Sequence, residues 1–445
     1  MAGKPANQHS GTDSAVPLDQ RLSRGSLTMA WWGICSAMFY LVVGAALAMG
    51  FGTRNAIIGL LLSVVCYGAI NALISRYAIA SGLSVAQFSR RLFGRAGAAL
   101  ATLLFSATAI YYAAFEGSVM AVAFNHYASA ISLEQAFLLV VVVYSVLLIF
   151  GHAMRWLDKL NGVLLPLYLL GLVAALLMAV DQYGYSSAWL ELAPEGGAPA
   201  YGWWNCFTYF MGVWVLMMYT WDYARFGRPE DSDYHARVNF GMPFYAVAFL
   251  LNGLAGIFLA ATIPTEGGVS EVSVVLSIVQ LMGLWGLLFV WVTQTRINTG
   301  NFFLGATNLQ ALGASLGLGR VPYVVWAALT GLTVYLLMRF DVFSYILQAL
   351  AWQSIFIVAW VAIALAHILA ARGVPVADDA SLPAFDTRGL LAWFGAAATG
   401  IVLLKAGDAS LATFSAPATF VVAFAGYRLL CAGRRRAWSA STDSL

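Results

Sequence analysis

Two charged side chains, Glu116 and Arg296, stand well inside long apolar stretches of the sequence. A lone charge at the centre of a bilayer costs about 2.5–3.5 kcal/mol on insertion scales, and such residues usually mark substrate or proton pathways. We therefore predict that both face one polar cavity, with Glu116 as the protonation site and Arg296 as a fixed counter-charge. The alternatives are a structural ion pair or hydrogen-bonded carboxyl for Glu116, and snorkelling to an interface for Arg296.

Polar and aromatic neighbours accompany both charges. Tyr112 and Glu116 are four residues apart, which places them on one helix face. An aromatic ring beside a carboxylate suits a flat heterocycle that carries N–H donors. Asn298 and Asn301 share a face in the polar stretch "TQTRINTGNFFLGATNL" (293–309) and are candidate substrate contacts. The alternatives are ordinary aromatic packing for Tyr112, and interhelical hydrogen bonding for one of the two asparagines.

The elements that position these residues are predicted to be membrane helices. Of the 445 residues, 61% are hydrophobic and 10% are charged, whereas soluble domains have about 25% charged residues. This composition excludes a water-soluble globule and predicts an all-α polytopic membrane protein. Twelve transmembrane helices are predicted near 29–50, 55–75, 97–124, 134–152, 160–180, 203–221, 240–263, 274–304, 322–338, 342–370, 389–404 and 411–431.

Positive charges are distributed unevenly over the predicted loops. Nearly all of the 23 Lys and Arg residues fall in alternate loops and in the two terminal segments. The opposite side has Arg54, Arg339 and Lys405. By the positive-inside rule, both termini are cytoplasmic in a multi-pass protein of the cell membrane.

The sequence lacks the motifs of several classes of function. It has no phosphate-binding glycine loop, no HExxH and no paired histidines. We therefore predict no enzyme activity, no cofactor, no metal and no nucleic-acid partner. A passive channel needs a continuous polar lining, whereas the intramembrane polar residues gather at one depth, which favours a closed binding site.

Spans 1 and 6 contain small residues at which a helix can break. Gly33 and Ser36 lie on span 1, and Gly212 lies beside Trp214 on span 6. Transporters built from inverted five-helix repeats bind substrate at discontinuous helices in matching positions of the two halves. In a 5+5 scheme spans 1 and 6 correspond, as do spans 3 and 8, which carry Glu116 and Arg296.

Three segments together resemble the nucleobase–cation symporter family, the purine/cytosine permease group. They are "WDYARFGR" (221–228), "ASGLS…FSRRLFG" (80–94) and "NTGNFF" (298–303). The resemblance covers nearly the whole chain. It implies a leucine-transporter-like fold: a cytoplasmic tail (1–28), a core of two inverted five-helix repeats (29–370), two extra C-terminal helices (371–432) and a second cytoplasmic tail (433–445).

The resemblance also implies a binding site for a flat heterocycle between spans 1, 3, 6 and 8. Tyr112 matches the family's stacking aromatic residue, and Glu116 matches the glutamine of hydantoin-type members. The position of the cytosine-type glutamine is taken by Ala109. The span 6 contacts match Gly212, Val213 and Trp214, and the first asparagine of the span 8 motif matches Asn298.

The family's sodium site maps to Gly33 and Ser36 on span 1 and to Thr293, Arg296 and Ile297 on span 8. Two of the three span 8 residues depart from the family pattern, and a guanidinium at this place repels Na⁺. We therefore expect proton coupling, or exchange that is independent of an ion, rather than sodium coupling.

The sequence thus predicts a secondary active importer of a nucleobase or related N-heterocycle, such as a purine, cytosine or a hydantoin- or allantoin-like compound. Its partners would be this substrate, a coupling cation (H⁺ favoured over Na⁺) and the lipid bilayer. The alternatives are an amino-acid or amine transporter of the same fold, and a sodium-coupled nucleobase symporter.

Overall fold

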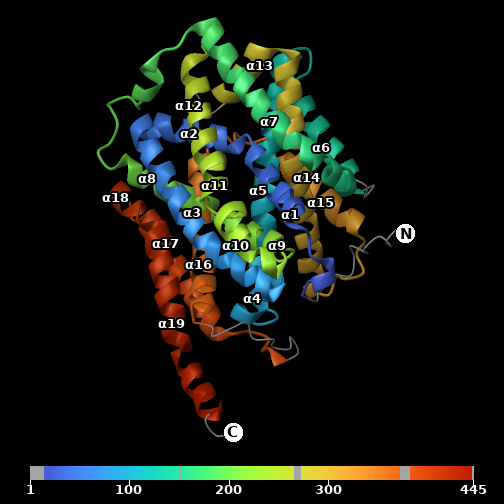
Figure 1. Cartoon of the computed structure of the whole chain (residues 1–445), viewed down its shortest axis with the longest axis vertical. Helices are drawn as coiled ribbons and strands as arrows, with labels where there is room; N and C mark the ends of the chain where they lie inside the picture. Colours follow the sequence, from blue (N-terminus) through green and yellow to red (C-terminus); the bar gives the residue numbers. More distant parts are fainter. Residues whose placement is uncertain (1–14, 150–152, 265–271, 371–380, 443–445) are drawn as a thin grey trace.

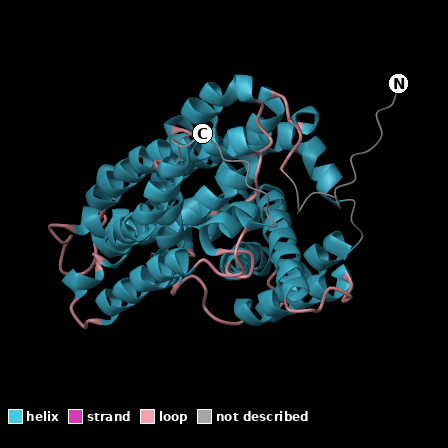
Figure 2. Cartoon of the chain, turned by 90° about the horizontal axis from the view of Figure 1, so that it is seen from below, coloured by secondary structure: helices cyan, strands magenta, loops and turns pink. Residues whose placement is uncertain are grey.

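The computed structural model describes residues 15–149, 153–264, 272–370 and 381–442, and within these ranges the chain is α-helical without a β-strand (Figure 2). Among the described residues, seven helices are long and apolar enough to cross a membrane, or eight if one bent pair is counted as a single span. The predicted all-α membrane fold is confirmed. The count of twelve spans and the 5+5 repeat stay predictions, because several other apolar helices have only 10–17 residues.

The first half of the chain contains η1 (Leu18–Gln20), α1 (Arg24–Trp32), η2 (Gly33–Ser36), α2 (Phe39–Phe51), α3 (Thr53–Ser81), α4 (Val85–Phe93), α5 (Ala98–Tyr127), α6 (Leu133–Ile149), α7 (Ala153–Tyr183), η3 (Ser187–Glu191), α8 (Gly202–Phe210), η4 (Met211–Trp214) and α9 (Val215–Ala224). The second half contains η5 (Pro229–Asp231), α10 (Ser232–Tyr234), η6 (His235–Asn239), α11 (Met242–Tyr245), η7 (Ala246–Leu251), α12 (Asn252–Thr262), α13 (Ser273–Met282), α14 (Leu284–Ser315), α15 (Tyr323–Met338), α16 (Ile346–Ile368), α17 (Thr387–Lys405), α18 (Ala409–Ala412) and α19 (Ser415–Thr442).

Two of the apolar segments are interrupted near their middle. Between α1 and α2 the chain passes through the 3₁₀ turn η2 and bends by 42°. Between α8 and α9 it passes through the 3₁₀ turn η4. Each interruption withdraws backbone groups from regular helical hydrogen bonding, so other elements must supply partners for them.

The core is built from helix pairs in direct contact. α5 packs along α14, α3 along α8, and α2 against α12. Glycine allows the α2–α12 pair to approach closely, since a Cβ on Gly44 would lie 2.5 Å from the Cα of Gly253. A Cβ on Gly256 would likewise lie 2.1 Å from the carbonyl oxygen of Leu41. Small residues are the usual means by which membrane helices pack tightly.

The last two long helices lie at one edge of the molecule. α17 and α19 run side by side and contact α16 (Figure 1). α19 continues to Thr442, so it includes most of the segment predicted as the C-terminal tail, 433–445.

The eighth predicted span, 274–304, is not one helix. Gly283 has φ +54° and ψ −129°, and it separates α13 from α14. This backbone conformation is open to glycine and strained for other residues. A lone glycine in an apolar stretch is compatible with a continuous helix, so the sequence pattern gave no sign of the break. α14 then extends to Ser315, beyond the predicted end.

The segment 15–23, predicted to belong to a tail, packs against the ends of α3 and α9. The Arg21 guanidinium donates to the carbonyl oxygens of Ile79 at 2.8 Å, Gly227 at 2.7 Å and Val16 at 3.1 Å. Leu22 pairs with Gly227 as an isolated parallel bridge. Burial, and then the nearby Arg225, lower the pKa of Arg21. The tail prediction missed this contact because a single arginine among polar residues is typical of a solvent-exposed segment.

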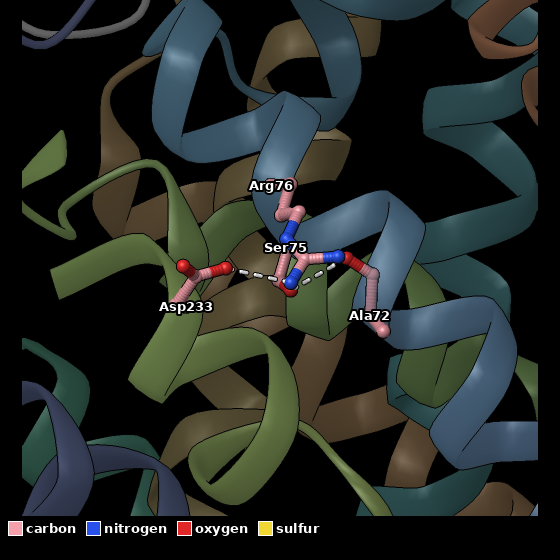
Figure 3. Close-up of polar contacts among 4 residues, drawn as sticks. All are labelled: Ala72, Ser75, Arg76 and Asp233. Atoms are coloured by element: carbon pink, nitrogen blue, oxygen red, sulfur yellow. Dashed lines mark hydrogen bonds and ion pairs between the residues drawn. The ribbon is translucent and has the colours of Figure 1, made fainter.

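A second link joins α3 to the connection after α9. Arg76 on α3 forms an ion pair with Asp233 on α10 at 2.7 Å, and the Ser75 hydroxyl donates to the Ala72 carbonyl one turn earlier (Figure 3). Both charged side chains are largely exposed, and exposed ion pairs contribute little to stability. The buried Arg21 contacts are therefore the stronger link at this end of α3.

We predict that Arg21→Ala destabilises the protein by about 2–4 kcal/mol, because it removes a charged donor from three carbonyl groups. Thermal unfolding of the detergent-purified protein measures the effect. Arg24→Ala is the matched control: Arg24 lies on the face of the Tyr234 ring at 4.9 Å, and we expect it to change stability by less than about 1 kcal/mol. Equal effects of the two substitutions would contradict the assignment.

Candidate functional site

The break between α1 and α2 creates the polar centre of the site. Ala37 is extended, with φ −63° and ψ 126°, and α2 begins two residues later. The carbonyl oxygen of Cys35, freed by the break, accepts the Asn252 side-chain amide from α12 at 2.7 Å. Asn252 in turn accepts the Tyr168 hydroxyl from α7 at 2.9 Å. The break is therefore held open by side chains of other helices.

The Glu116 carboxylate is placed at the start of α2. Glu116 is 1% exposed, on α5. It accepts a hydrogen bond from the side-chain amide of Gln294 on α14, and the backbone of Phe39 donates to it. The oxygen of the same Gln294 amide accepts the Met38 N–H at 3.2 Å. The first N–H groups of a helix lack internal partners, and the helix dipole favours negative charge there.

A cavity adjoins this group. Its volume is about 40 Å³. Its lining joins both broken segments with α5, α9 and α14. The lining residues are Ile34, Ala37, Phe39, Tyr40, Tyr112, Glu116, Val213, Val215, Leu216, Tyr219, Ile297 and Asn301. The site is thus mainly aromatic and aliphatic, with one carboxylate and one amide.

Aromatic rings form the wall around Glu116. The Tyr112 ring meets Phe39 edge to face at 5.1 Å between centroids. Its hydroxyl donates to Gln353 on α16 at 3.4 Å. Phe39 also packs on Phe115 at 5.4 Å. Tyr112 and Glu116, which the sequence placed on one helix face, both line the cavity.

The three residues predicted as substrate contacts at the second break lie in different surroundings. Val213 lines the cavity. Gly212 packs against the backbone of α16, where a Cβ would lie 2.3 Å from the Leu350 carbonyl oxygen. The Trp214 ring contacts Tyr67 and Phe420, and Trp214 is not among the residues that line the cavity. Of the three predicted span 6 contacts, only Val213 is therefore among the lining residues.

The asparagines of α14 differ in their contacts. Asn301 lines the cavity and accepts the Tyr219 hydroxyl at 3.2 Å. Asn298 is fully buried, and neither its amide nitrogen nor its oxygen has a hydrogen-bond partner within the described part of the chain. Burying an amide without a partner costs about 1–3 kcal/mol by protein mutational data.

The register of α5 against α14 fixes the level of Asn298. Ser106 donates to the Gly305 carbonyl at 3.0 Å, and Glu116 pairs with Gln294. The two helices therefore run antiparallel. One turn from the Glu116 pair, Asn298 comes level with Tyr112, between the carboxylate and Asn301.

Three of the residues predicted for ion coupling lie together. The Ser36 hydroxyl donates to the Gly33 carbonyl at 2.8 Å and approaches the Thr293 carbonyl oxygen at 3.5 Å. The Thr293 hydroxyl is used within α14, where it donates to Val290. The side chain of Arg296, the predicted counter-charge, lies outside the described part of the structure.

Sequence reasoning missed Gln294, Tyr219, Phe39 and Tyr40. One signal for Gln294 was present, because Gln294, Asn298 and Asn301 follow the i, i+4, i+7 spacing of one helix face. No sequence signal shows which aromatic residues of a broken helix face the cavity.

No protein-family model and no curated protein matches the sequence. The structure is similar to Mhp1 in an inward-facing conformation, with TM-score 0.76 and 13% identity over 95% of this chain and 94% of that one. It is also similar to Mhp1, described as a nucleobase-cation-symport-1 family transporter, in a closed conformation with bromovinylhydantoin bound: TM-score 0.70, 13% identity, 97% and 96% covered. A manganese transporter of Eremococcus coleocola matches with TM-score 0.55 and 13% identity over 95% and 97%. The chain has the fold of these membrane transporters.

We predict that Asn298→Leu leaves thermal stability unchanged or raises it by up to about 2 kcal/mol, because the substitution removes an unpartnered buried amide. Asn301→Leu is the matched control and should lower stability, since it leaves the Tyr219 hydroxyl without its acceptor. Thermal unfolding of both variants in one detergent gives the comparison. A greater loss for Asn298→Leu than for Asn301→Leu would show that Asn298 has a structural partner.

Proposed function

We propose that the protein is a proton-linked secondary active transporter for a flat N-heterocycle, in the cell membrane with both termini in the cytoplasm. The observation that carries the proposal is a buried carboxylate at the break of a membrane helix, facing an aromatic cavity. Intramembrane carboxylates of this kind are expensive and belong to substrate or proton pathways. Discontinuous helices near the bilayer midplane are where transporters bind their cargo.

The lining suits a planar ligand with N–H groups. Tyr112, Tyr40 and Tyr219 offer ring faces and edges for stacking. Glu116 accepts N–H donors, and the Asn301 amide nitrogen has no partner within the described residues. Asn298, level with Tyr112, is not among the lining residues, but its amide has a donor and an acceptor without partners within the described residues. This pattern supports a nucleobase- or hydantoin-like substrate that presents both N–H and C=O groups.

The cavity is too small for such a ligand without a change of shape. A cavity of about 150 Å³ accommodates benzene, whereas this one has about 40 Å³. Alternating access supplies the change, because the broken helices move relative to the rest of the bundle. Substrate binding and opening are then coupled steps.

We propose that Glu116 binds and releases the coupled proton. The titratable side chains that interact with it among the described residues are Tyr40, Tyr112 and Tyr168. Phenols ordinarily keep their protons near pH 7, so the carboxyl is the member of this group that changes charge. A protonated carboxyl presents one donor and one acceptor, as a glutamine amide does.

A cationic amine is the second candidate substrate. Tyrosine rings around a carboxylate also bind organic cations. A manganese ion is less well matched, because the lining offers it one carboxylate and one amide, whereas Mn²⁺ prefers several oxygen ligands.

We predict that at least one heterocycle among hypoxanthine, cytosine, uracil and hydantoin raises the melting temperature of the purified protein by several degrees at saturation. A ligand at 100 times its Kd stabilises by about 2.7 kcal/mol. Choline, leucine and MnCl₂ serve as the amine, amino-acid and metal probes. A shift with choline or leucine, and with none of the heterocycles, would indicate an amine or amino-acid substrate instead of a heterocycle.

We predict that a proton gradient, and not a sodium gradient, drives accumulation of the best ligand in proteoliposomes. Glu116→Gln should retain binding within about tenfold, lower the rate of uptake, and remove its dependence on pH, because the amide mimics the protonated carboxyl. The exposed Glu134, which contacts Tyr335 and Arg339, provides the matched control Glu134→Gln. Sodium-driven accumulation, or an unchanged pH profile in Glu116→Gln, would exclude the proton mechanism.

A further inference from the structure

Gln294 bonds to two different helical segments with the two ends of one amide. Its oxygen accepts the Met38 N–H at the break of the first span, and its nitrogen donates to Glu116 on α5. The backbone N–H of Phe39 also donates to the Glu116 carboxylate. The three elements α2, α5 and α14 are therefore joined in one closed set of hydrogen bonds, which we term the Gln294 bridge (Gln294, Glu116, Met38 and Phe39).

The bridge needs a donor and an acceptor on one side chain. The amide of glutamine provides both on one planar group, and asparagine is shorter by one methylene. A carboxylate at this position could accept from Met38 but could not donate to Glu116. The next two N–H groups of α2 have partners within the turn: Tyr40 donates to the carbonyl oxygen of Ala37, and Leu41 donates to that of Met38. The bridge thus supplies the partners that the start of α2 lacks.

We infer that Gln294 is a positioning residue that passes the state of Glu116 to the broken first span. When the carboxylate accepts from Gln294, the start of α2 is tied to α5 and α14 and the cavity stays closed. A proton on the carboxyl group removes the charge that strengthens the hydrogen bond from Gln294, and a ligand N–H competes with Gln294 for the same oxygen. The amide then turns away, Met38 loses its acceptor, and α2 is free to move.

The inference rests on the proposed transport function for its meaning, but its test needs no substrate. Val213 lines the cavity from the second break and is distant from Gln294 in sequence. In a background with the four native cysteines replaced, Val213→Cys reports access to the cavity through its rate of reaction with a water-soluble maleimide. Gln294→Leu should raise this rate at least fivefold, because the start of α2 loses its tie.

Controls separate an open cavity from a damaged fold. Gln280→Leu is the matched glutamine variant, since Gln280 lies on α13 and contacts Tyr183 at 3.4 Å; it should leave the Val213→Cys rate unchanged. A second background retains only Cys206, which is buried between α3 and α8. Its labelling should remain slow in Gln294→Leu, whereas general unfolding would accelerate it.

A double variant tests whether Gln294 acts through Glu116. If it does, Glu116→Leu combined with Gln294→Leu labels Val213→Cys no faster than the faster single variant. Independent effects that multiply, an unchanged rate in Gln294→Leu, or equal acceleration at Cys206 would each overturn the inference. A protein that binds no heterocycle yet shows the selective acceleration would refute the proposed substrate and leave the Gln294 bridge in place.

Discussion

The bond between Glu116 and Gln294 is the interaction on which the rest of the site depends. A carboxylate that is 1% exposed in an apolar helix bundle receives its solvation from the protein. An intact helix has no spare N–H groups in its middle, so a continuous first span could not supply donors. The break at Ala37 frees the N–H of Phe39 for the carboxylate and the N–H of Met38 for the side-chain oxygen of Gln294. The buried carboxylate therefore depends on the broken helix.

The carbonyl groups freed by the two breaks are satisfied in a reciprocal way. Asn252 on α12 donates to Cys35 at the first break, and Tyr67 on α3 donates to Phe210 at the second, both at 2.7 Å. In each case the donor belongs to a helix that follows a broken segment and packs on the other broken segment. A pseudo-two-fold repeat predicts this exchange, although the repeat itself stays a prediction. Irregular backbone is tolerated at membrane depth where protein surrounds it, and the side-chain donors at both breaks meet this condition.

Some of this arrangement could be predicted from the sequence, and some depended on packing. Apolar composition predicted the helical membrane fold, and four-residue spacing placed Tyr112 beside Glu116. The direction of Trp214 could not be predicted, because the close approach of Gly212 to Leu350 sets the rotation of the second break. Gln294 was missed for a related reason: its role follows from a backbone group at Met38, and the sequence does not show where a helix will expose one.

The closed set of bonds also limits how a ligand can act on the protein. A ligand shifts a conformational equilibrium only by its difference in affinity for the two states. In the closed form the Glu116 carboxylate already accepts from Gln294 and Phe39, so a ligand N–H that takes the oxygen bonded to Gln294 displaces an internal donor. In an open form with α2 released, the same oxygen is available without that loss. The ligand therefore prefers the open form, and the stronger its bond to Glu116, the larger this preference becomes.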